Sequence, residues 1–188
     1  YVLLINRIER EINNVQSNYF YELNISCPNT ETGMTIGDNP ILLNELISTI
    51  RKNISKVISV KVSPDSPNKT LKEIGEIISG YDSMILNAGN TQFKSRKELN
   101  FSKFDFSMDG GGLSGASLFT RTLEMVKLFS SYNIPIMATG GISNINHINA
   151  LENAGASLFG MASSLVFDPY CIPRINKMVK SNVYYSTS

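Results

Sequence analysis

The chain has 188 residues, and its 17 Lys and Arg nearly balance its 16 Asp and Glu, for a formal net charge of +1. This balance gives no basis for binding nucleic acid or an anionic membrane surface. No apolar run approaches the roughly 20 residues that span a bilayer, and no signal peptide is visible. Its two cysteines, Cys27 and Cys171, are too few for a disulfide scaffold and indicate a reducing compartment.

Short β-rich runs alternate with longer helical runs along the whole chain. Strands are predicted over 2–5, 19–24, 57–62, 83–87, 134–138 and 157–160. Helices are predicted over 9–17, 41–53, 71–79, 118–132, 144–154 and 172–180. The segment 91–110 reads as long and irregular, which in a compact domain indicates function or disorder. Because no low-complexity linker divides the chain, we expect one domain over residues 1–188.

This alternation predicts βαβ units and a parallel sheet, either open and doubly wound or closed into a (β/α)8 barrel. Polar or glycine-rich residues follow nearly every predicted strand, and a barrel gathers the carboxyl ends of its strands around one mouth. We therefore expect a (β/α)8 TIM barrel. Only about six of its eight βα units are found, and a barrel takes roughly 250 residues. The chain is thus expected to be the C-terminal three quarters of a barrel whose first two strands lie upstream of Tyr1.

A thiol stands between two carboxamides where the second predicted strand becomes a loop. Asn24 and Asn29 offer both donors and acceptors, which suits a planar ligand with carbonyl and N–H groups. Cys27 could act as a base or nucleophile if its pKa is lowered. The alternative is a buried structural cysteine in a turn made by Asn and Pro.

One cation and several glycines complete the candidate chemistry. Lys61 ends an otherwise apolar strand, so it is expected to be buried near the barrel mouth, where it could stabilise an anionic ring or phosphate. Gly140 and Gly141 follow one strand and Gly160 follows the next, and paired loops of this kind late in a barrel are typical of a phosphate site. The only histidine, His147, reads as a surface residue, and no metal-ligand spacing is visible.

The residues at 22–30, Glu-Leu-Asn-Ile-Ser-Cys-Pro-Asn-Thr, resemble the signature of the dihydroorotate dehydrogenases. Val-Lys-Val-Ser-Pro at 60–64, Gly-Gly-Leu-Ser-Gly at 111–115, Gly-Gly-Ile at 140–142 and the segment 155–169 follow in that family's order and spacing. A cysteine at position 27, where the other class has serine, suggests the soluble, cytoplasmic class 1.

The resemblance implies an FMN-binding (β/α)8 barrel that oxidises (S)-dihydroorotate to orotate in pyrimidine (UMP) biosynthesis. Cys27 would take a proton from C5 of the substrate while a hydride moves from C6 to flavin N5. Asn24 and Asn29 would hold the substrate, together with either Asn87 or the Asn90-Thr91 pair. Residues expected to contact FMN are Lys61, Gly112, Gly140, Gly141, Gly160 and Met161, the last standing where the family usually has Thr.

Two alternatives stay open from the sequence. One is a related FMN barrel acting on another pyrimidine, like the dihydropyrimidine dehydrogenases, although those often have His where Asn29 stands. The other is a truncated, inactive remnant or interaction subunit. The resemblance also implies a homodimer, with or without an iron–sulfur flavoprotein subunit, and the electron acceptor (fumarate, NAD or another oxidant) is left open.

Overall fold

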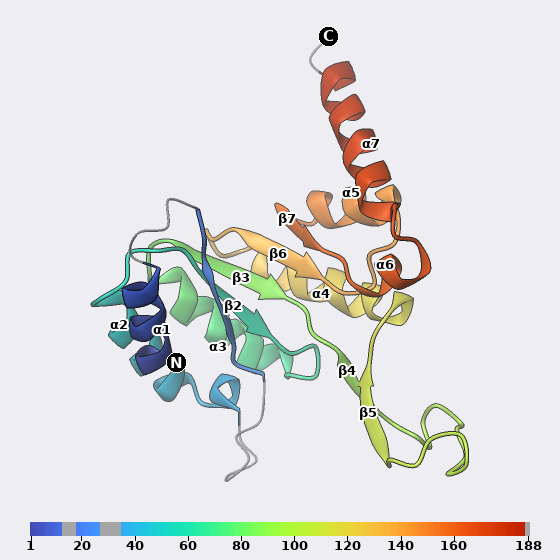
Figure 1. Ribbon diagram of the computed structural model, residues 1–188, viewed down its shortest axis with the longest axis horizontal. Coiled ribbons are helices and arrows are strands. Elements are labelled where there is room, and N and C mark those ends of the chain that lie inside the picture. The colour runs from blue at the N-terminus through green and yellow to red at the C-terminus, as the bar shows by residue number, and fades with distance from the viewer. Residues whose placement is uncertain (13–17, 27–34, 187–188) are drawn as a thin grey trace.

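The computed structural model describes residues 1–12, 18–26 and 35–186, and side chains as far as residue 179. Its centre is a five-stranded sheet in the order β1-β2-β3-β6-β7, in which every neighbouring pair is parallel (Figure 1). The strands are β1 (Tyr21–Asn24), β2 (Ile58–Val62), β3 (Met84–Ala88), β6 (Ile136–Thr139) and β7 (Leu158–Gly160). This arc of strands with intervening helices agrees with a barrel of which the chain holds a part.

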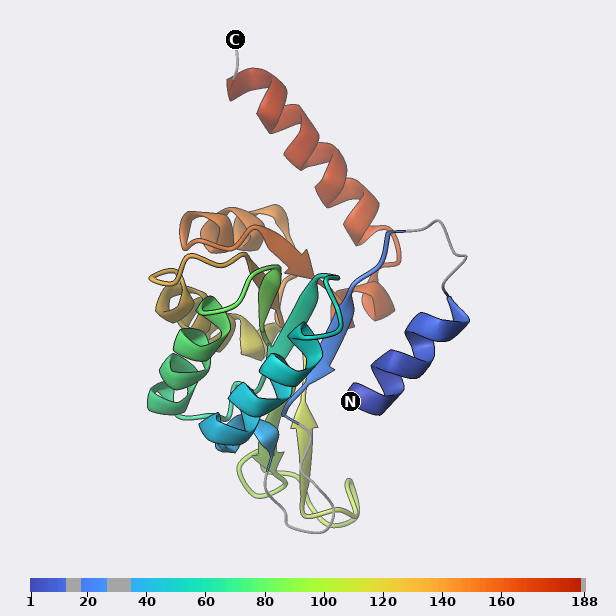
Figure 2. The same ribbon diagram turned by 90° about the vertical axis from the view of Figure 1, so that its left-hand side faces the viewer.

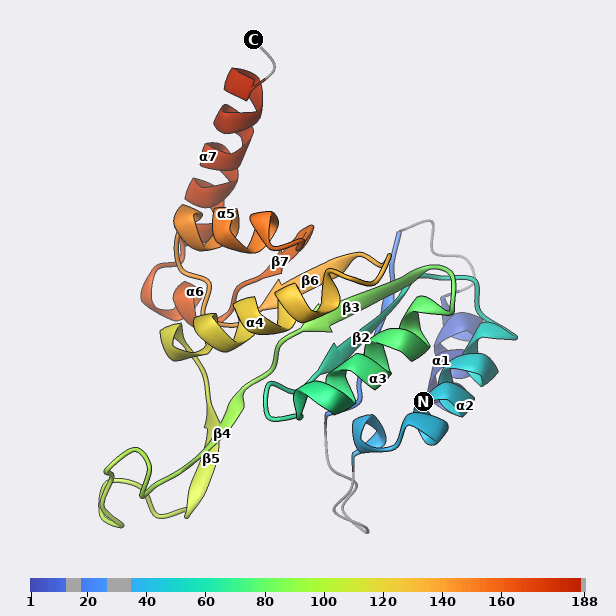
Figure 3. The ribbon, with the colours of Figure 1, turned by 180° about the vertical axis from the view of Figure 1, so that it is seen from behind.

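Helices cover one face of the sheet. Figure 3 shows them in front of the strands: α2 (Pro40–Arg51), α3 (Asn68–Ser79), α4 (Phe119–Phe129) and α5 (Ile145–Asn153). Local signals fix where two of them begin, because Asn39 caps α2 ahead of Pro40 and Asn144 caps α5 through the N–H of His147. Short 3-10 turns, η1 (Ile36–Asp38) and η2 (Ala116–Leu118), precede α2 and α4.

Strand alternation separates an apolar face from a polar one. Leu23, Val60 and Leu86 pack in the hydrophobic core and are at most 1% exposed. Their neighbours along the strands point to the opposite face because side chains alternate with a period of two. That face, which is turned to the viewer in Figure 1, carries Glu22, Asn24, Ser59, Lys61 and Asn87.

The segment predicted as a first strand is instead the start of helix α1 (Val2–Glu11). The run Val-Leu-Leu-Ile is too short for its period to be read, and a short apolar run can belong to either structure. In the helix, Ile5 is buried whereas Leu3 and Leu4 are exposed, and α1 contacts α2. The described parallel sheet therefore has five strands, not six; residues 13–17, the end of the predicted helix 9–17, lie outside the described part.

The segment 91–110 is more regular than expected. It contains most of a hairpin made by β4 (Gln92–Ser95) and β5 (Gly110–Leu113), which pair antiparallel. Figures 1 and 3 show this hairpin extending away from the sheet. The hairpin strands escaped prediction because β5 is Gly-Gly-Gly-Leu, which carries no β-propensity signal.

The C-terminal part adds a short helix that the sequence did not predict, α6 (Ser163–Phe167). The predicted helix over 172–180 lies within the longer helix α7 (Cys171–Ser186). Helix α7 extends beyond the body of the molecule in both Figure 1 and Figure 2. Among the residues described here, no helix is both long and apolar enough to cross a bilayer.

Candidate ligand site at the carboxyl ends of the strands

Three polar residues stand side by side on neighbouring strands. Asn24 at the end of β1 is directly opposite Lys61 in β2, and Lys61 is directly opposite Asn87 in β3. All three therefore belong to the polar face of the sheet, close to the carboxyl ends of their strands. In parallel barrels and doubly wound sheets this end of the strands is where ligands bind.

A cavity of about 410 Å³ opens beside this row, within the range of roughly 300–1,000 Å³ typical of cofactor sites. It is lined by segments from β2, from the ends of β3, β6 and β7, from η2, and from α6 and the start of α7. The predicted site residues in its wall are Lys61, Asn90, Thr91, Gly140, Gly141, Gly160 and Met161. Residues that sequence reasoning missed include Ser114, Thr139, Ser143, Ser163, Ser164 and Asp168.

Glycine is required by close packing at two of these positions. A Cβ atom at Gly141, where φ is +72°, would lie 2.3 Å from the backbone nitrogen of Phe119. A Cβ atom at Gly160 would lie 2.4 Å from Thr139 Oγ1. Both glycines present bare backbone to the cavity, and such backbone can accept the close approach of a phosphate.

Lys61 is the cation of the cavity wall on strand β2. Its side chain is half-buried, and within the described part of the chain its ammonium has no hydrogen-bond or ion-pair partner. A half-buried ammonium with no protein partner remains available to an anionic or carbonyl-bearing ligand. Lys61 was expected to be buried near the mouth, and it lies in the cavity wall but is only half-buried.

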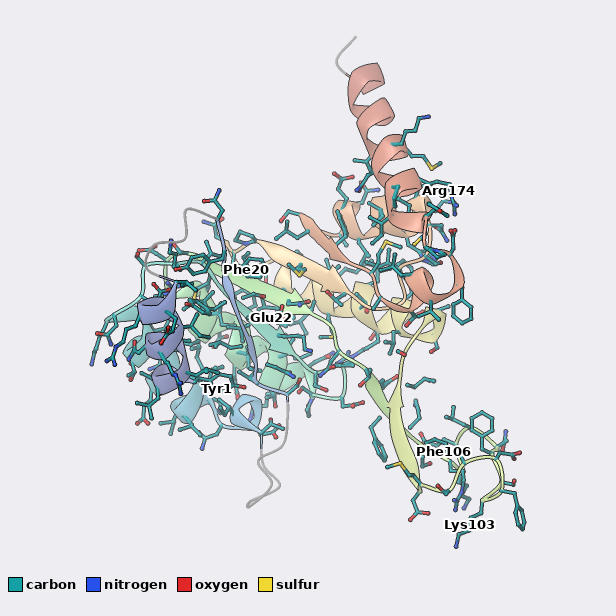
Figure 4. The ribbon with its side chains drawn as sticks, viewed as in Figure 1. Tyr1, Phe20, Glu22, Lys103, Phe106 and Arg174 are labelled. Atoms are coloured by element: carbon teal, nitrogen blue, oxygen red, sulfur yellow. The ribbon has the colours of Figure 1, made fainter. Side chains whose placement is uncertain are left out.

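The two candidate asparagines after β3 differ in their surroundings. Asn90 lines the cavity, whereas Asn87 is 3% exposed and lies outside the cavity wall. Asn87 Nδ2 donates to Glu22 Oε2 at 2.7 Å, and Ser59 Oγ donates to the same carboxylate oxygen at 3.2 Å. Among the described residues, Asn87 Oδ1 has no hydrogen-bond donor. Glu22, labelled on β1 in Figure 4, was not predicted as a polar anchor, because its partners are 37 and 65 residues away.

Several other predicted residues lie elsewhere. Gly112 is in hairpin strand β5, outside the main cavity; it faces Thr91 Oγ1 and lines a smaller cavity of about 180 Å³. Asn24 also lies outside the main cavity wall, next to Lys61. Cys27 and Asn29 lie outside the described residues.

His147, predicted to be a surface residue, and Cys171 both lie close to the cavity. His147 is half-buried and stacks on Phe119, with ring centroids 3.9 Å apart. Its Nδ1 atom accepts a hydrogen bond from the backbone N–H of Ser143, a cavity residue. Cys171, which is not among the site residues predicted from the sequence, is buried and lines the cavity.

Asp168 connects the cavity to helix α7. Its carboxylate accepts from both guanidinium nitrogens of Arg174, and its Oδ1 also accepts from the backbone N–H of Tyr170. The hydrogen bond from Arg174 holds the pKa of Asp168 below its ordinary value. Figure 4 shows Arg174 near the base of α7.

The fold and cavity define an α/β protein of the parallel barrel class, with a glycine-lined ligand site at the carboxyl ends of its strands. The family model for dihydroorotate dehydrogenase matches residues 1–183. The chain belongs to the dihydroorotate dehydrogenase family.

Relatives and solved structures agree with this assignment. The catalytic subunits of dihydroorotate dehydrogenase B (NAD(+)) from Bacillus thuringiensis and Bacillus cereus are 31% identical over 170 residues. That match covers 89% of this chain and 54% of each relative, so the chain spans about half the length of the curated relatives it matches.

Two crystal structures of dihydroorotate dehydrogenase from Eimeria tenella, one with ferulenol and one ligand-free, superpose with TM-scores of 0.74 and 0.72 at 19% identity. They cover 95% and 89% of this chain, and 55% and 52% of the solved chains. This likeness confirms the predicted barrel class, of which the chain holds a part.

Proposed function

We propose that this chain forms part of an FMN-dependent enzyme that oxidises (S)-dihydroorotate to orotate in pyrimidine biosynthesis. The observation that carries the proposal is a glycine-lined cavity whose wall holds Lys61, Asn90 and Thr91, with Asn24 opposite Lys61 in the sheet, in a chain of this family. Carboxamides and one cation suit a pyrimidine ring with carbonyl, N–H and carboxylate groups.

The volume and the lining residues of the cavity support an FMN site. Gly140, Gly141 and Gly160 would offer bare backbone to the phosphate and ribityl chain, and Lys61 would meet the flavin ring or the ribityl chain. Met161 can contribute its backbone N–H, although it lacks the hydroxyl of a threonine. Gly112 would act through Thr91, against which it packs, and not by direct contact with the cavity.

FMN supplies the acceptor for a hydride when it is bound. The chain's own part in the reaction is to hold the substrate and to move one proton. Cys27 removes the proton from C5 of dihydroorotate, the hydride leaves C6, and a C5–C6 double bond remains in orotate. Asn24, Asn29 and Asn90 with Thr91 orient the ring; Asn90 is preferred to Asn87 because Asn90 lines the cavity.

The assembly and electron acceptor are proposed from the relatives. The Bacillus proteins are named as catalytic subunits of an NAD(+) enzyme, and we propose that this chain likewise works in the cytoplasm as a homodimer with an iron–sulfur flavoprotein subunit. Electrons would then pass from the flavin to NAD(+) and not to fumarate.

An anaerobic visible spectrum tests the proposal. The protein is purified with the flanking sequence of its native reading frame, and spectra are taken before and after dihydroorotate is added, with dihydrouracil as the control. A flavin spectrum that is bleached by dihydroorotate and not by dihydrouracil is expected. Bleaching by dihydrouracil alone would favour the related pyrimidine enzyme, and a protein without flavin would favour the inactive remnant.

A further inference from the structure

Ser26 links two carboxamides that come from opposite sides of strand β2. Asn90 Nδ2 donates to Ser26 Oγ at 2.5 Å, and Ser26 Oγ donates to Asn24 Oδ1 at 2.6 Å. Asn24 ends β1 and Asn90 follows β3, and these two strands are separated in the sheet by β2. The hydroxyl therefore joins the ends of two strands that do not pair with each other, beside the strand that carries Lys61.

The direction of these hydrogen bonds fixes how each amide is turned. A serine hydroxyl has one proton, and here that proton goes to Asn24 Oδ1. Asn90 Oδ1 accepts from the backbone N–H of Thr91 at 2.9 Å, so its Nδ2 is the group turned to Ser26. If the Asn24 amide turned over, the NH2 groups of both asparagines would face Ser26 Oγ. The hydroxyl proton of Ser26 would then no longer have Asn24 Oδ1 as its acceptor. The amide of Asn24 is thus held with its NH2 group left over as a hydrogen-bond donor.

We propose that Ser26 is a positioning residue that fixes Asn24 as a donor toward the ligand, so that the site selects a ligand with an acceptor oxygen there. Ser26 and Asn24 both lie outside the cavity wall, and Ser26 acts through Asn24, which is opposite the cavity residue Lys61, and through Asn90, which lines the cavity. The inference rests on the proposed function, which supplies a pyrimidine carboxylate as the ligand. An oxygen of its carboxylate or a ring carbonyl matches an NH2 donor, whereas an amide NH2 in that place does not.

The test compares Ser26→Ala with Ser26→Thr in the full-length protein. Binding of orotate and of orotamide, in which an amide replaces the carboxylate, is measured by calorimetry, and bound FMN is measured separately from its absorbance. Losing one fixed donor is expected to weaken orotate binding about 5-fold to 10-fold in Ser26→Ala. Because Asn24 is then free to turn over, orotamide should lose less affinity than orotate. Ser26→Thr keeps the hydroxyl and should bind orotate as the wild type does, and FMN content should be equal in all three proteins.

A second variant tests the donor directly. Asn24→Asp keeps an oxygen for Ser26 to donate to and replaces the NH2 group with a second acceptor. It is expected to lose orotate affinity by a larger factor than Ser26→Ala, again with FMN retained. If Ser26→Ala does not fold, Asn24→Asp alone decides: unchanged orotate binding in that variant would overturn the inference.

The failures of the inference and of the proposed function give different results. If the wild type binds orotate and Ser26→Ala binds it equally well, the positioning role is wrong and the function stands. Equal weakening in Ser26→Ala and Ser26→Thr would show that the site responds to side-chain volume, which also overturns the inference. A wild type that binds FMN but no orotate would overturn the proposed function and the inference together.

Discussion

Cys27 is the proposed general base of the reaction. A thiol reaches its thiolate form far more easily than an alcohol, so Cys27→Ser should keep FMN but slow flavin reduction near neutral pH. A general base contributes about 10²-fold to 10⁴-fold to a rate, and a loss in this range is expected. Anaerobic stopped-flow absorbance at pH 7 measures it, and an unchanged rate would refute Cys27 as the base.

A comparison of Gly141 with Gly115 distinguishes two reasons for requiring glycine, the strain of a positive φ and the steric clash of an added Cβ atom. Both have positive φ, +72° and +103°, so both pay a backbone strain of about 1–3 kcal/mol when replaced by alanine. Only at Gly141 would the new Cβ meet backbone, at 2.3 Å from Phe119 N, because nothing lies within 4 Å at Gly115. Gly141→Ala should therefore lower the free energy of unfolding clearly more than Gly115→Ala, as measured by urea denaturation. Equal losses would mean that Phe119 moves aside freely.

Helix α1 gives an element-scale test of the corrected assignment. Ile5 is 4% exposed and belongs to the core, whereas Leu3, two residues away, is 86% exposed. In a strand these two residues would share a face. Ile5→Ala is expected to cost about 2–5 kcal/mol of unfolding free energy, and Leu3→Ala about 0.5 kcal/mol or less. Similar losses of unfolding free energy for the two variants in urea titrations would favour the strand that was predicted over residues 2–5.

The start of helix α7 is expected to respond to acid through Asp168. Its pKa is lowered in the folded protein by the hydrogen bond from Arg174, so folding favours the ionised carboxylate. The stabilisation is complete above the unfolded pKa of about 3.9 and is lost as the pH falls through the lower folded value. Asp168→Asn should therefore have a lower free energy of unfolding than the wild type at pH 7, and this difference should become smaller below about pH 4. Urea titrations at pH 7 and pH 3 measure the difference in unfolding free energy between the two proteins. A difference of the same size at both pH values would contradict this account.

At the scale of the whole molecule, the ligand site exists only when distant segments meet. Its cavity is built from residues between Lys61 and Cys171, carried by four strands and the loops after them. Alternation predicted a parallel sheet, and the observed strand pairing places Asn24, Lys61 and Asn87 in one row without any local signal between them. The site is therefore a property of the register of the sheet.

The sequence predicts those features that repeat locally. Leu71, Ile74 and Ile78 recur at helical spacing, and all three are buried in α3 as this period requires. The apolar strand around Lys61 predicted a buried side chain, and the structure shows it half-buried. Contacts between distant residues leave no such trace: the Ser26–Asn90 hydrogen bond joins residues 64 apart, and the triple glycine of β5 is a strand only because β4 lies beside it.

The two faces of the sheet also bear on how this protein can change over time. Residues of the ligand site occupy alternate positions of each strand, as at Asn24, Lys61 and Thr139, and the packed core occupies the positions between them, as at Leu23, Val60 and Ala138. Mutations on the first set can alter what the protein recognises while leaving the core volume untouched. A library randomised at 24, 61 and 139 should accordingly yield more folded members than one at 23, 60 and 138. Because site positions and core positions alternate along each strand, this sheet can acquire new specificities by mutation without first losing its fold.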